Sequence, residues 1–265
     1  DRHTPVICDR LIHHSLLVGV KASGAKLIRF KHNNLSELER LLKKSRQSNP
    51  QKQPLVITES LFSMEGTTAP IKEISKLCIK YDSKLLIDEA HALGVMGPEG
   101  RGESFGFKEA ISIISGTLGK AFGSGGAFLA TDKKIGENLI QNCGAFRYTT
   151  ALAPPLCASA LAALNLIESN PAWGRELKEK SIAIRDRLSQ IGWQRPVGEG
   201  PIISLILGSD ELAIDYQKRL EAQRLLTVAI RPPTVPEGKS RLRLVIRRNT
   251  PIQAFERLIT VLKNK

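Results

Sequence analysis

Apolar residues in the first half of the chain fall into short continuous runs, separated by longer stretches in which they recur at helical spacing. The runs cover residues 5–9, 26–30, 54–58, 84–87 and 111–114. The clearest helical stretches are residues 35–46 and 70–81. Continuous apolar runs, unlike alternating ones, are typical of parallel strands that are covered on both faces. Strands that alternate with helices indicate βαβ units, so a mainly parallel sheet is predicted.

The helix predicted over residues 35–46 has two candidate N-terminal caps. Asn34 is followed three residues later by Glu37. Ser36 is followed at the same spacing by Glu39. Either pair can form a capping box, in which each residue's side chain accepts a hydrogen bond from the other's backbone N–H.

The pattern changes near Pro154 and Pro155. Beyond them, helices are predicted over residues 156–167, 173–191, 211–223 and 251–263, and strands over residues 202–207, 226–231 and 241–246. We therefore predict an α/β large domain over residues 1–155 and a smaller α+β domain over residues 156–265.

Composition places the chain among globular proteins. Hydrophobic residues make up 42% of its 265 residues and charged residues 25%, which is enough for a sizeable core. The sequence contains no run of eighteen apolar residues, so a membrane span is not predicted. Four scattered cysteines, without a C-x-x-C pair, argue against a zinc site or a redox motif. A reducing, cytoplasmic location is the simplest interpretation.

The formal net charge of +13 could attract nucleic acid, anionic lipid or a polyphosphate-bearing substrate. The basic residues are spread along the chain. The nearest approach to a cluster, Arg241, Arg243, Arg247 and Arg248, lies in a predicted strand without interleaved aromatic residues. Nucleic-acid binding by base stacking is therefore not predicted.

The stretch "LLIDEAHALG" at residues 85–94 ends an apolar run with the tetrapeptide of DEAH helicases. A nucleotide-hydrolysing enzyme also needs the phosphate loop G-x-x-x-x-G-K-[ST], normally before the acidic motif. The nearest match, Gly119-Lys120, follows that motif, is succeeded by Ala121, and has Ile114 where the first glycine belongs. The helicase interpretation is rejected. A structural alternative remains, in which Asp88 caps the turn after its strand.

Several reactive side chains follow predicted strands. Ser63 comes after one strand, and Asp88 and His91 come after the next. The strand at 111–114 leads into "SGTLGKAFGSGG" at 115–126, which offers hydroxyls, flexible backbone N–H groups and a lysine. Ligands of open α/β sheets bind beyond the carboxyl ends of the strands. This loop can hold a phosphate group and present an amine beside it.

A lysine, an acid and a phosphate-binding loop at the ends of neighbouring strands suit pyridoxal 5′-phosphate (PLP). A lysine forms a Schiff base with this cofactor, and an acid keeps the pyridine nitrogen protonated so that the ring withdraws electrons. Lys120 lies between an apolar strand and a glycine-rich run, downstream of Asp88. This context favours a cofactor-binding role for Lys120 over that of a solvated surface lysine.

Four segments complete the pattern: "TESLFSMEGTTAPIKEI", "LLIDEAHALGVMGPEGRG", "SGTLGKAFGSGGAF" and "AIRPPTVPEGKSRLRL". In this order and spacing they resemble the α-oxoamine synthases, a family of fold-type-I PLP enzymes. The resemblance runs from Asp9 to the C-terminus. It implies a large domain with a mainly parallel sheet and a smaller C-terminal domain. Family members also have an N-terminal portion without a counterpart in this sequence.

The resemblance implies roles for the residues of the central motifs. Lys120 would carry the Schiff base with PLP and later move the α-proton of the substrate. Asp88 would pair with the pyridine nitrogen, and His91 would hydrogen-bond the phenolic oxygen of the cofactor. These three residues form the expected catalytic set. Thr117 would bind the cofactor phosphate.

The resemblance extends to five further residues. His13 would stack on the cofactor ring, and Ser63 would contact the cofactor near its phenolic oxygen. Arg231 would hold the carboxylate of the amino-acid substrate. Thr149 and Thr150 match a family segment that reaches the phosphate site of a partner subunit. The family resemblance thus implies a homodimer with shared active sites.

The activity implied is a PLP-dependent acyl transfer. L-alanine loses its α-proton, its carbon attacks a pimeloyl thioester on coenzyme A or a carrier protein, and carbon dioxide is lost, as in biotin synthesis. Other branches of the family join glycine to acetyl or succinyl thioesters, or serine to a palmitoyl thioester. The motif "IRPPTVP" favours the alanine–pimeloyl branch. An inactive, N-terminally shortened remnant that serves as a binding protein is the alternative from a different class.

Overall fold

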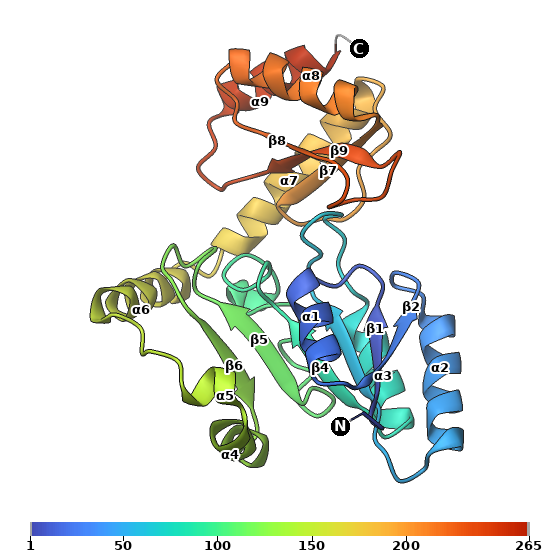
Figure 1. Ribbon diagram of the computed structural model, residues 1–265. Coiled ribbons are helices and arrows are strands. Elements are labelled where there is room, and N and C mark those ends of the chain that lie inside the picture. Colours follow the sequence, from blue (N-terminus) through green and yellow to red (C-terminus); the bar gives the residue numbers. More distant parts are fainter. Residues whose placement is uncertain (1, 264–265) are drawn as a thin grey trace. The chain divides into compact units, whose positions relative to one another are not determined.

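The computed structural model describes residues 2–263, which form two compact units (Figure 1). The first unit comprises the chain up to Phe62 together with Ala69–Pro171. The second comprises Ser63–Thr68 and the chain from Ala172 onward. Each unit has its own sheet, and they are described separately below.

The first unit is built on a six-stranded sheet in the order β2-β1-β3-β4-β5-β6. The strands are β1 (Pro5–Asp9), β2 (Lys26–Phe30), β3 (Leu55–Glu59), β4 (Lys84–Asp88), β5 (Ile113–Thr117) and β6 (Ala127–Thr131). Neighbouring strands from β2 to β5 are parallel, and only β6 pairs antiparallel, with β5. The predicted mainly parallel sheet is confirmed.

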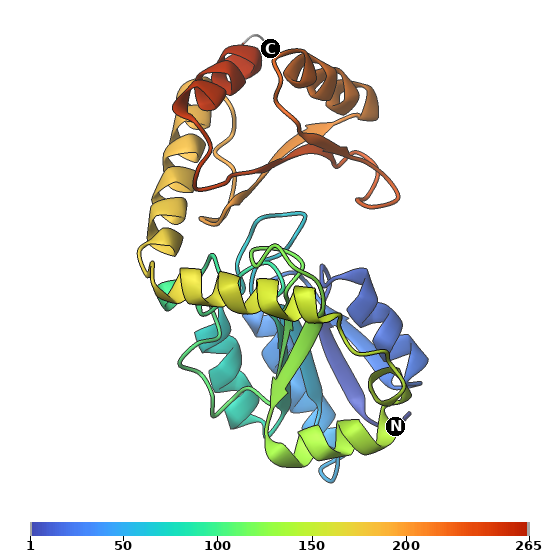
Figure 2. The same ribbon diagram turned by 90° about the vertical axis from the view of Figure 1, so that its left-hand side faces the viewer.

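Helices cover both faces of this sheet. Figure 2 shows α1 (His14–Ala22) and α3 (Ile71–Lys80) on opposite sides of it. The core between the layers joins Ile7 of β1 and Leu85 of β4 to Leu38 of α2 (Leu35–Ser48), and all three side chains are fully buried. Each contributes about 1.5–3 kcal/mol by leaving water, which is why the central strands are apolar without alternation.

The first of the two candidate caps begins α2. The side chain of Asn34 accepts a hydrogen bond of 2.8 Å from the backbone N–H of Glu37. The Glu37 carboxylate does not accept the reciprocal hydrogen bond from the backbone N–H of Asn34. It accepts a bond of 2.8 Å from the backbone N–H of Lys31, which holds the preceding loop against the helix.

The strand predicted at 111–114 is displaced, because β5 runs on through Ser115, Gly116 and Thr117. These residues have little apolar surface of their own, so the pattern did not reveal them. A Cβ at Gly116 would lie 2.4 Å from the ring of Phe128 and 2.7 Å from Leu93. The neighbouring side chains thus supply the packing that the glycine cannot.

Three helices follow β6 in the first unit: α4 (Lys133–Asn142), α5 (Gly144–Arg147) and α6 (Pro154–Glu168). Of these three helices, only α6 was predicted. The helix α1 and the strand β6 were not predicted either. A single 3₁₀ turn, η1 (Pro98–Gly100), interrupts the long loop after β4. The domain boundary predicted after residue 155 falls inside α6, and the domain assignment stays a prediction.

The second unit is an α+β layer structure. Its antiparallel sheet has the order β7-β9-β8. The strands are β7 (Ile202–Gly208), β8 (Val228–Ile230) and β9 (Ser240–Val245), and the helices are α7 (Trp173–Gln190), α8 (Asp210–Ala222) and α9 (Ile252–Lys263). Figure 2 shows α8 and α9 on one face of this sheet.

The segment Ser63–Thr68 joins the second unit through close backbone contacts. Gly66 has a φ of +73°, and a Cβ there would lie 2.2 Å from the carbonyl oxygen of Ile202. The Arg243 guanidinium donates a hydrogen bond of 2.7 Å to the Ser63 carbonyl. Arg241 pairs with Glu65 at 3.2 Å. Two of the clustered arginines therefore serve the fold of this segment.

A buried arginine organises the second unit. Arg185 of α7 is fully buried, and its guanidinium donates to the carbonyl oxygens of Ser181 (3.1 Å), Gly200 (2.9 Å), Ile202 (2.7 Å) and Val197 (3.3 Å). Burial lowers the pKa of Arg185 to about 10, so the group is still charged at neutral pH. It fastens the irregular stretch before β7 to the helix.

All four cysteines are free thiols, and Cys8 and Cys78 are buried in the first unit. Burial raises the pKa of Cys8 to about 12 and that of Cys78 to about 11, so neither is a reactive thiolate at neutral pH. Among residues 2–263, no helix has the length and apolar character needed to cross a membrane.

We expect Arg185→Met to destabilise the second unit by about 3 kcal/mol or more, because it leaves several buried carbonyls without a donor. Both tryptophans, Trp173 and Trp193, lie in this unit, so urea unfolding followed by their fluorescence reports on it. Arg187→Met is the matched control: this exposed side chain lies on the same helix and should change stability by no more than about 0.5 kcal/mol. Equal unfolding midpoints for the two variants would contradict the role of Arg185.

Candidate functional site

The carboxyl ends of the parallel strands bring five of the predicted residues to one edge of the sheet. Because β1, β3, β4 and β5 run in the same direction, their last residues share that edge. His13 follows β1, Asp88 ends β4, His91 lies in the next turn, Thr117 ends β5, and Lys120 is in the loop beyond it. This is the edge at which α/β sheets bind ligands.

Asp88 and His91 are fixed on one short turn. Asp88 is the register partner of Ser115 in β5. Its Oδ1 accepts a hydrogen bond of 2.9 Å from the backbone N–H of Ala90. The turn closes when Ala92 donates to the Glu89 carbonyl at 2.9 Å. Asp88 and His91 are both half-buried, so they are held in place and still accessible.

Lys120 lies in the tight connection between the antiparallel strands β5 and β6. The backbone N–H of Leu118 donates to Gly126 at 2.9 Å, and Ser124 donates back to Leu118 at 2.9 Å. Within the loop, Gly123 donates to the Lys120 carbonyl at 3.0 Å. The loop is therefore closed by its own hydrogen bonds, and the Lys120 side chain is exposed.

The Thr117 hydroxyl closes the base of this loop. It donates to the Gly126 carbonyl at 3.2 Å and accepts from the Gly119 N–H at 3.2 Å. A hydroxyl has one donor and two acceptor sites, so one acceptor site remains for a ligand or water. Ser124 extends the arrangement, since its hydroxyl donates to the Leu156 carbonyl at the start of α6 at 2.6 Å.

His13 has a structural role at the same edge. It is the N-cap residue of α1, and its Nδ1 lies 3.3 Å from the backbone N of Ser15 and 2.8 Å from the Ser15 hydroxyl. Its side chain is exposed. Within the sheet, β3 separates β1 from β4, so His13 and Asp88 extend from strands that are not adjacent. The predicted stacking of His13 on a cofactor ring stays a prediction.

The other four predicted residues lie elsewhere along the chain. Ser63 and Arg231 belong to the second unit, where Ser63 is buried and Arg231 is exposed. Thr149 and Thr150 lie between α5 and α6 and are exposed. The predicted roles of these four residues stay predictions.

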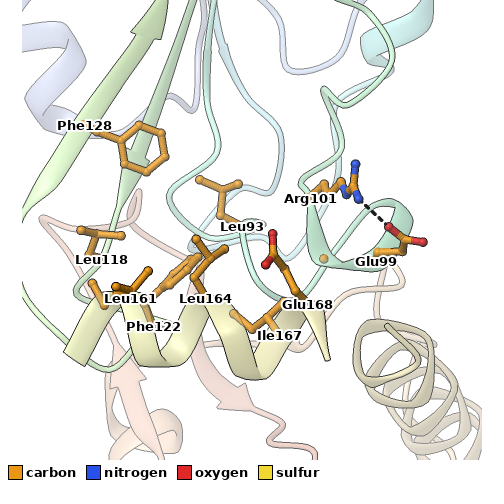
Figure 3. A pocket seen from close by; sticks show the side chains of 12 residues that line it. Leu93, Glu99, Arg101, Leu118, Phe122, Phe128, Leu161, Leu164, Ile167 and Glu168 are labelled. Carbon is orange, nitrogen blue, oxygen red and sulfur yellow. Dashed lines mark ion pairs between the residues drawn. The ribbon is translucent and has the colours of Figure 1, made fainter. Parts of the chain in front are cut away.

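A pocket of about 580 Å³ adjoins the Lys120 loop (Figure 3). Its wall is mainly apolar and is formed by Leu93, Leu118, Phe122, Phe128, Ala160, Leu161, Leu164 and Ile167, with Glu99, Gly100, Arg101 and Glu168 at its polar side. Glu99 and Arg101 form an ion pair of 2.9 Å. Lys120, Asp88 and His91 are not among its lining residues. The pocket therefore lies beside the predicted cofactor site and does not include the three residues predicted to be catalytic.

Sequence reasoning missed the second acid of the DEAH tetrapeptide. Glu89 is fully buried and accepts hydrogen bonds from the Ser60 hydroxyl (2.6 Å) and from the backbone N–H groups of Ser104 (2.6 Å) and Glu103 (3.3 Å). The available signal was a second carboxylate directly after an apolar run. A buried carboxylate requires such partners. Within residues 2–263, no group of three or more His, Cys, Asp or Glu side chains is arranged to hold a metal ion.

Comparisons with known proteins agree with the fold. Residues 1–262 match the aminotransferase class I and II family. The 8-amino-7-oxononanoate synthase of Anaeromyxobacter dehalogenans is 37% identical over 247 residues, which are 92% of this chain and 61% of that protein. The chain therefore spans about three fifths of the length of this curated relative.

Two solved structures show the same architecture. The 8-amino-7-oxononanoate synthase of Francisella tularensis has a TM-score of 0.84 at 28% identity. The match covers 99% of this chain and 75% of that protein's chain. The serine palmitoyltransferase of S. paucimobilis, solved with bound PLP–myriocin, has a TM-score of 0.90 at 26% identity. The match covers 98% of this chain and 66% of that protein's chain. Both are α-oxoamine synthases, the family that the sequence motifs of this chain resemble. The chain belongs to the aminotransferase class I and II family.

Proposed function

We propose that this chain carries the PLP site of an α-oxoamine synthase that condenses L-alanine with a pimeloyl thioester. The products would be 8-amino-7-oxononanoate, coenzyme A or a free carrier protein, and carbon dioxide. One observation carries the proposal: the register of β4 with β5 puts the Asp88 turn and the Lys120 loop at the same sheet edge. The names of two curated relatives, both 8-amino-7-oxononanoate synthases, support the choice of reaction.

The chemistry of this edge fits PLP. The cofactor needs an amine for its aldehyde, an acid for its ring nitrogen and donors for its phosphate. Lys120 offers an exposed amine and Asp88 a half-buried carboxylate. The Thr117 hydroxyl would donate to the phosphate by turning its proton from the Gly126 carbonyl to a phosphate oxygen. When bound, PLP supplies an electron sink for the negative charge that develops at the substrate Cα.

The chain's own residues would position the substrate and move its proton. Lys120 Nζ would hold the cofactor and, once the substrate amine has replaced it, accept the α-proton. The Asp88 carboxylate favours the protonated form of the ring nitrogen, since an opposite charge nearby stabilises the charged state. His91 would donate to the phenolic oxygen, and Arg231 would grip the substrate carboxylate through two parallel hydrogen bonds.

His13 and Ser63 would complete the contacts to the ring, and Thr117 those to the phosphate. Thr149 and Thr150 would serve the phosphate site of a second copy in a homodimer. Their exposure supports this role, because residues that act on a partner must be free to meet it. The basic surface would help to gather an anionic thioester.

A second candidate is a serine-using α-oxoamine synthase with a longer acyl substrate. Its support is the TM-score of 0.90 to a serine palmitoyltransferase, against 0.84 for an 8-amino-7-oxononanoate synthase. Among the solved structures, sequence identity is 28% for the 8-amino-7-oxononanoate synthase and 26% for the serine palmitoyltransferase, and curated relatives at 37% and 38% carry the former name. Identity weighs more for substrate choice, because specificity depends on the side chains that line a site rather than on the shared fold.

We expect purified protein to form a visible absorbance band with PLP, and borohydride reduction to leave the label on the peptide that contains Lys120. Lys120→Ala should remove both signals, because Lys120 supplies the amine that would form the Schiff base. Lys133→Ala is the matched control, since that lysine is exposed and lies on α4. A label on another peptide, or none, would refute the proposed site.

With PLP bound, alanine and a pimeloyl thioester should give the highest kcat/KM among pairings of alanine, glycine and serine with acetyl, pimeloyl and palmitoyl thioesters. Alanine and glycine differ by one methyl group, so alanine should lead by about tenfold or more. A preference for serine and the palmitoyl thioester would favour the second candidate. PLP binding without any turnover would instead identify a binding protein.

Thr117→Val should weaken PLP binding by about tenfold or more, because valine has the same shape but loses two hydrogen bonds that close the loop, each worth about 1 kcal/mol. Thr117→Ser keeps the hydroxyl and should stay within a few-fold of the wild type. Titration of the absorbance band with PLP measures both affinities. Weakening by Thr117→Ser without weakening by Thr117→Val would show that the methyl group, not the hydroxyl, is what the loop requires.

A further inference from the structure

Glu89 is a buried acid at the centre of the candidate site, and the proposed reaction does not use it. Its side chain has no exposed surface. Oε2 accepts from the Ser60 hydroxyl at 2.6 Å and from the Glu103 N–H at 3.3 Å, and Oε1 accepts from the Ser104 N–H at 2.6 Å. A carboxylate is costly to bury unless such donors surround it, so its presence here calls for a reason.

The carboxylate joins three separate segments of the first unit. Ser60 follows the end of β3, Glu89 begins the turn after β4, and Glu103 and Ser104 close the loop that contains η1. The loop lies directly against the acid, because a Cβ at Gly102, with a φ of +87°, would be 2.8 Å from the Glu89 Cδ. Glycine is therefore required for the loop to reach the carboxylate.

Ser60, which donates to the Glu89 carboxylate, also bonds to the peptide group between Asp88 and Glu89 through its backbone N–H and, at 3.3 Å, its hydroxyl. The Asp88 carbonyl accepts from the Ser60 N–H at 2.9 Å, and the Glu89 N–H donates to the Ser115 carbonyl at 2.8 Å. A peptide unit is planar, so bonds on both of its sides fix its rotation. Its rotation in turn sets the direction in which the Asp88 side chain leaves the strand.

We infer that Glu89 is a positioning residue, which fixes the direction of Asp88 and the turn that carries His91. It would act through the Asp88–Glu89 peptide and the Ser60 bridge, without touching the cofactor or the substrate. The inference rests on the proposed function, because it assumes that Asp88 serves the ring nitrogen of PLP. Charged hydrogen bonds are about twice as strong as neutral ones, which suits a group that must hold its neighbours still.

Two substitutions separate the negative charge from the hydrogen bonds. Glu89→Ala removes the carboxylate that accepts from Ser60, Glu103 and Ser104, so that the Ser60 hydroxyl loses its shorter bond and keeps the 3.3 Å bond to the Asp88 carbonyl. It also opens space in which the turn can shift. Glu89→Gln keeps the shape: its oxygen can accept from Ser104, and its NH₂ group can donate to the Ser60 hydroxyl, which can accept as well as donate. Only the longest bond, from Glu103, is then lost. Glutamine should therefore rescue most of what alanine loses.

The test measures PLP affinity by absorbance titration, the pH midpoint of the absorbance band of bound PLP, and thermal unfolding without PLP. Glu89→Ala should weaken PLP binding by about tenfold or more and move the midpoint by about one pH unit, equivalent to 1.4 kcal/mol between protonation states. Glu89→Gln should remain within about threefold of the wild type, with an unchanged midpoint. The control Glu99→Gln, at an exposed ion pair of the same loop, should change neither the PLP affinity nor the pH midpoint.

Ser60→Ala keeps the test decisive if Glu89→Ala does not fold. It removes one donor to the carboxylate and should shift the midpoint in the same direction by a smaller amount. The inference fails if the Glu89 and Ser60 variants lose only thermal stability and keep the wild-type affinity and midpoint. Absence of a PLP band in the wild type would instead refute the proposed function, so the two failures are distinguishable.

Discussion

The parallel pairing of β4 with β5 is the constraint on which the rest of the site depends (Figure 1). Because both strands run in the same direction and Asp88 pairs with Ser115, the turn after β4 and the loop after β5 must leave the sheet together. Side chains alternate between the faces of a strand, so a slip of one residue would send Asp88 to the opposite face. Two motifs separated in the sequence become one site only in this register.

Glu89 and Arg185 show how the two units stabilise their irregular segments. Each is a charged side chain with no exposed surface, and each bonds mainly to backbone groups of loops that lack regular hydrogen-bonding partners. Removing either would leave buried N–H or C=O groups unsatisfied. A charge is expensive to bury, and such a side chain is suited to holding loops that apolar packing alone cannot orient.

The sequence predicted the strands β1–β4, the helices α2, α3, α6, α7, α8 and α9, and the sheet edge that His13, Asp88, His91, Thr117 and Lys120 follow. Each of these depends on local patterns of apolar residues or on strand order. It did not predict β6, since Ala127–Thr131 is mostly exposed and follows directly on glycines. It placed β5 too early, because the packing at Gly116 is supplied by Phe128 and Leu93 from elsewhere in the chain. The role of Glu89 depends on Ser60 and Ser104, which only the folded chain brings to it.

The structural and chemical interpretations of Asp88 prove to be compatible. Its Oδ1 does cap the turn, through the N–H of Ala90, as a purely structural acid would. An ionised carboxylate has about four lone-pair sites on two oxygens, so a single backbone bond leaves capacity for a ligand. That bond also fixes the orientation of the group, and catalytic groups need a fixed orientation. The Thr117 hydroxyl likewise closes the loop with two bonds, and its proton can turn from the Gly126 carbonyl to a ligand oxygen. A residue's structural role is therefore no evidence against a chemical one at this edge. Structural bonds of this kind are what a preorganised site requires.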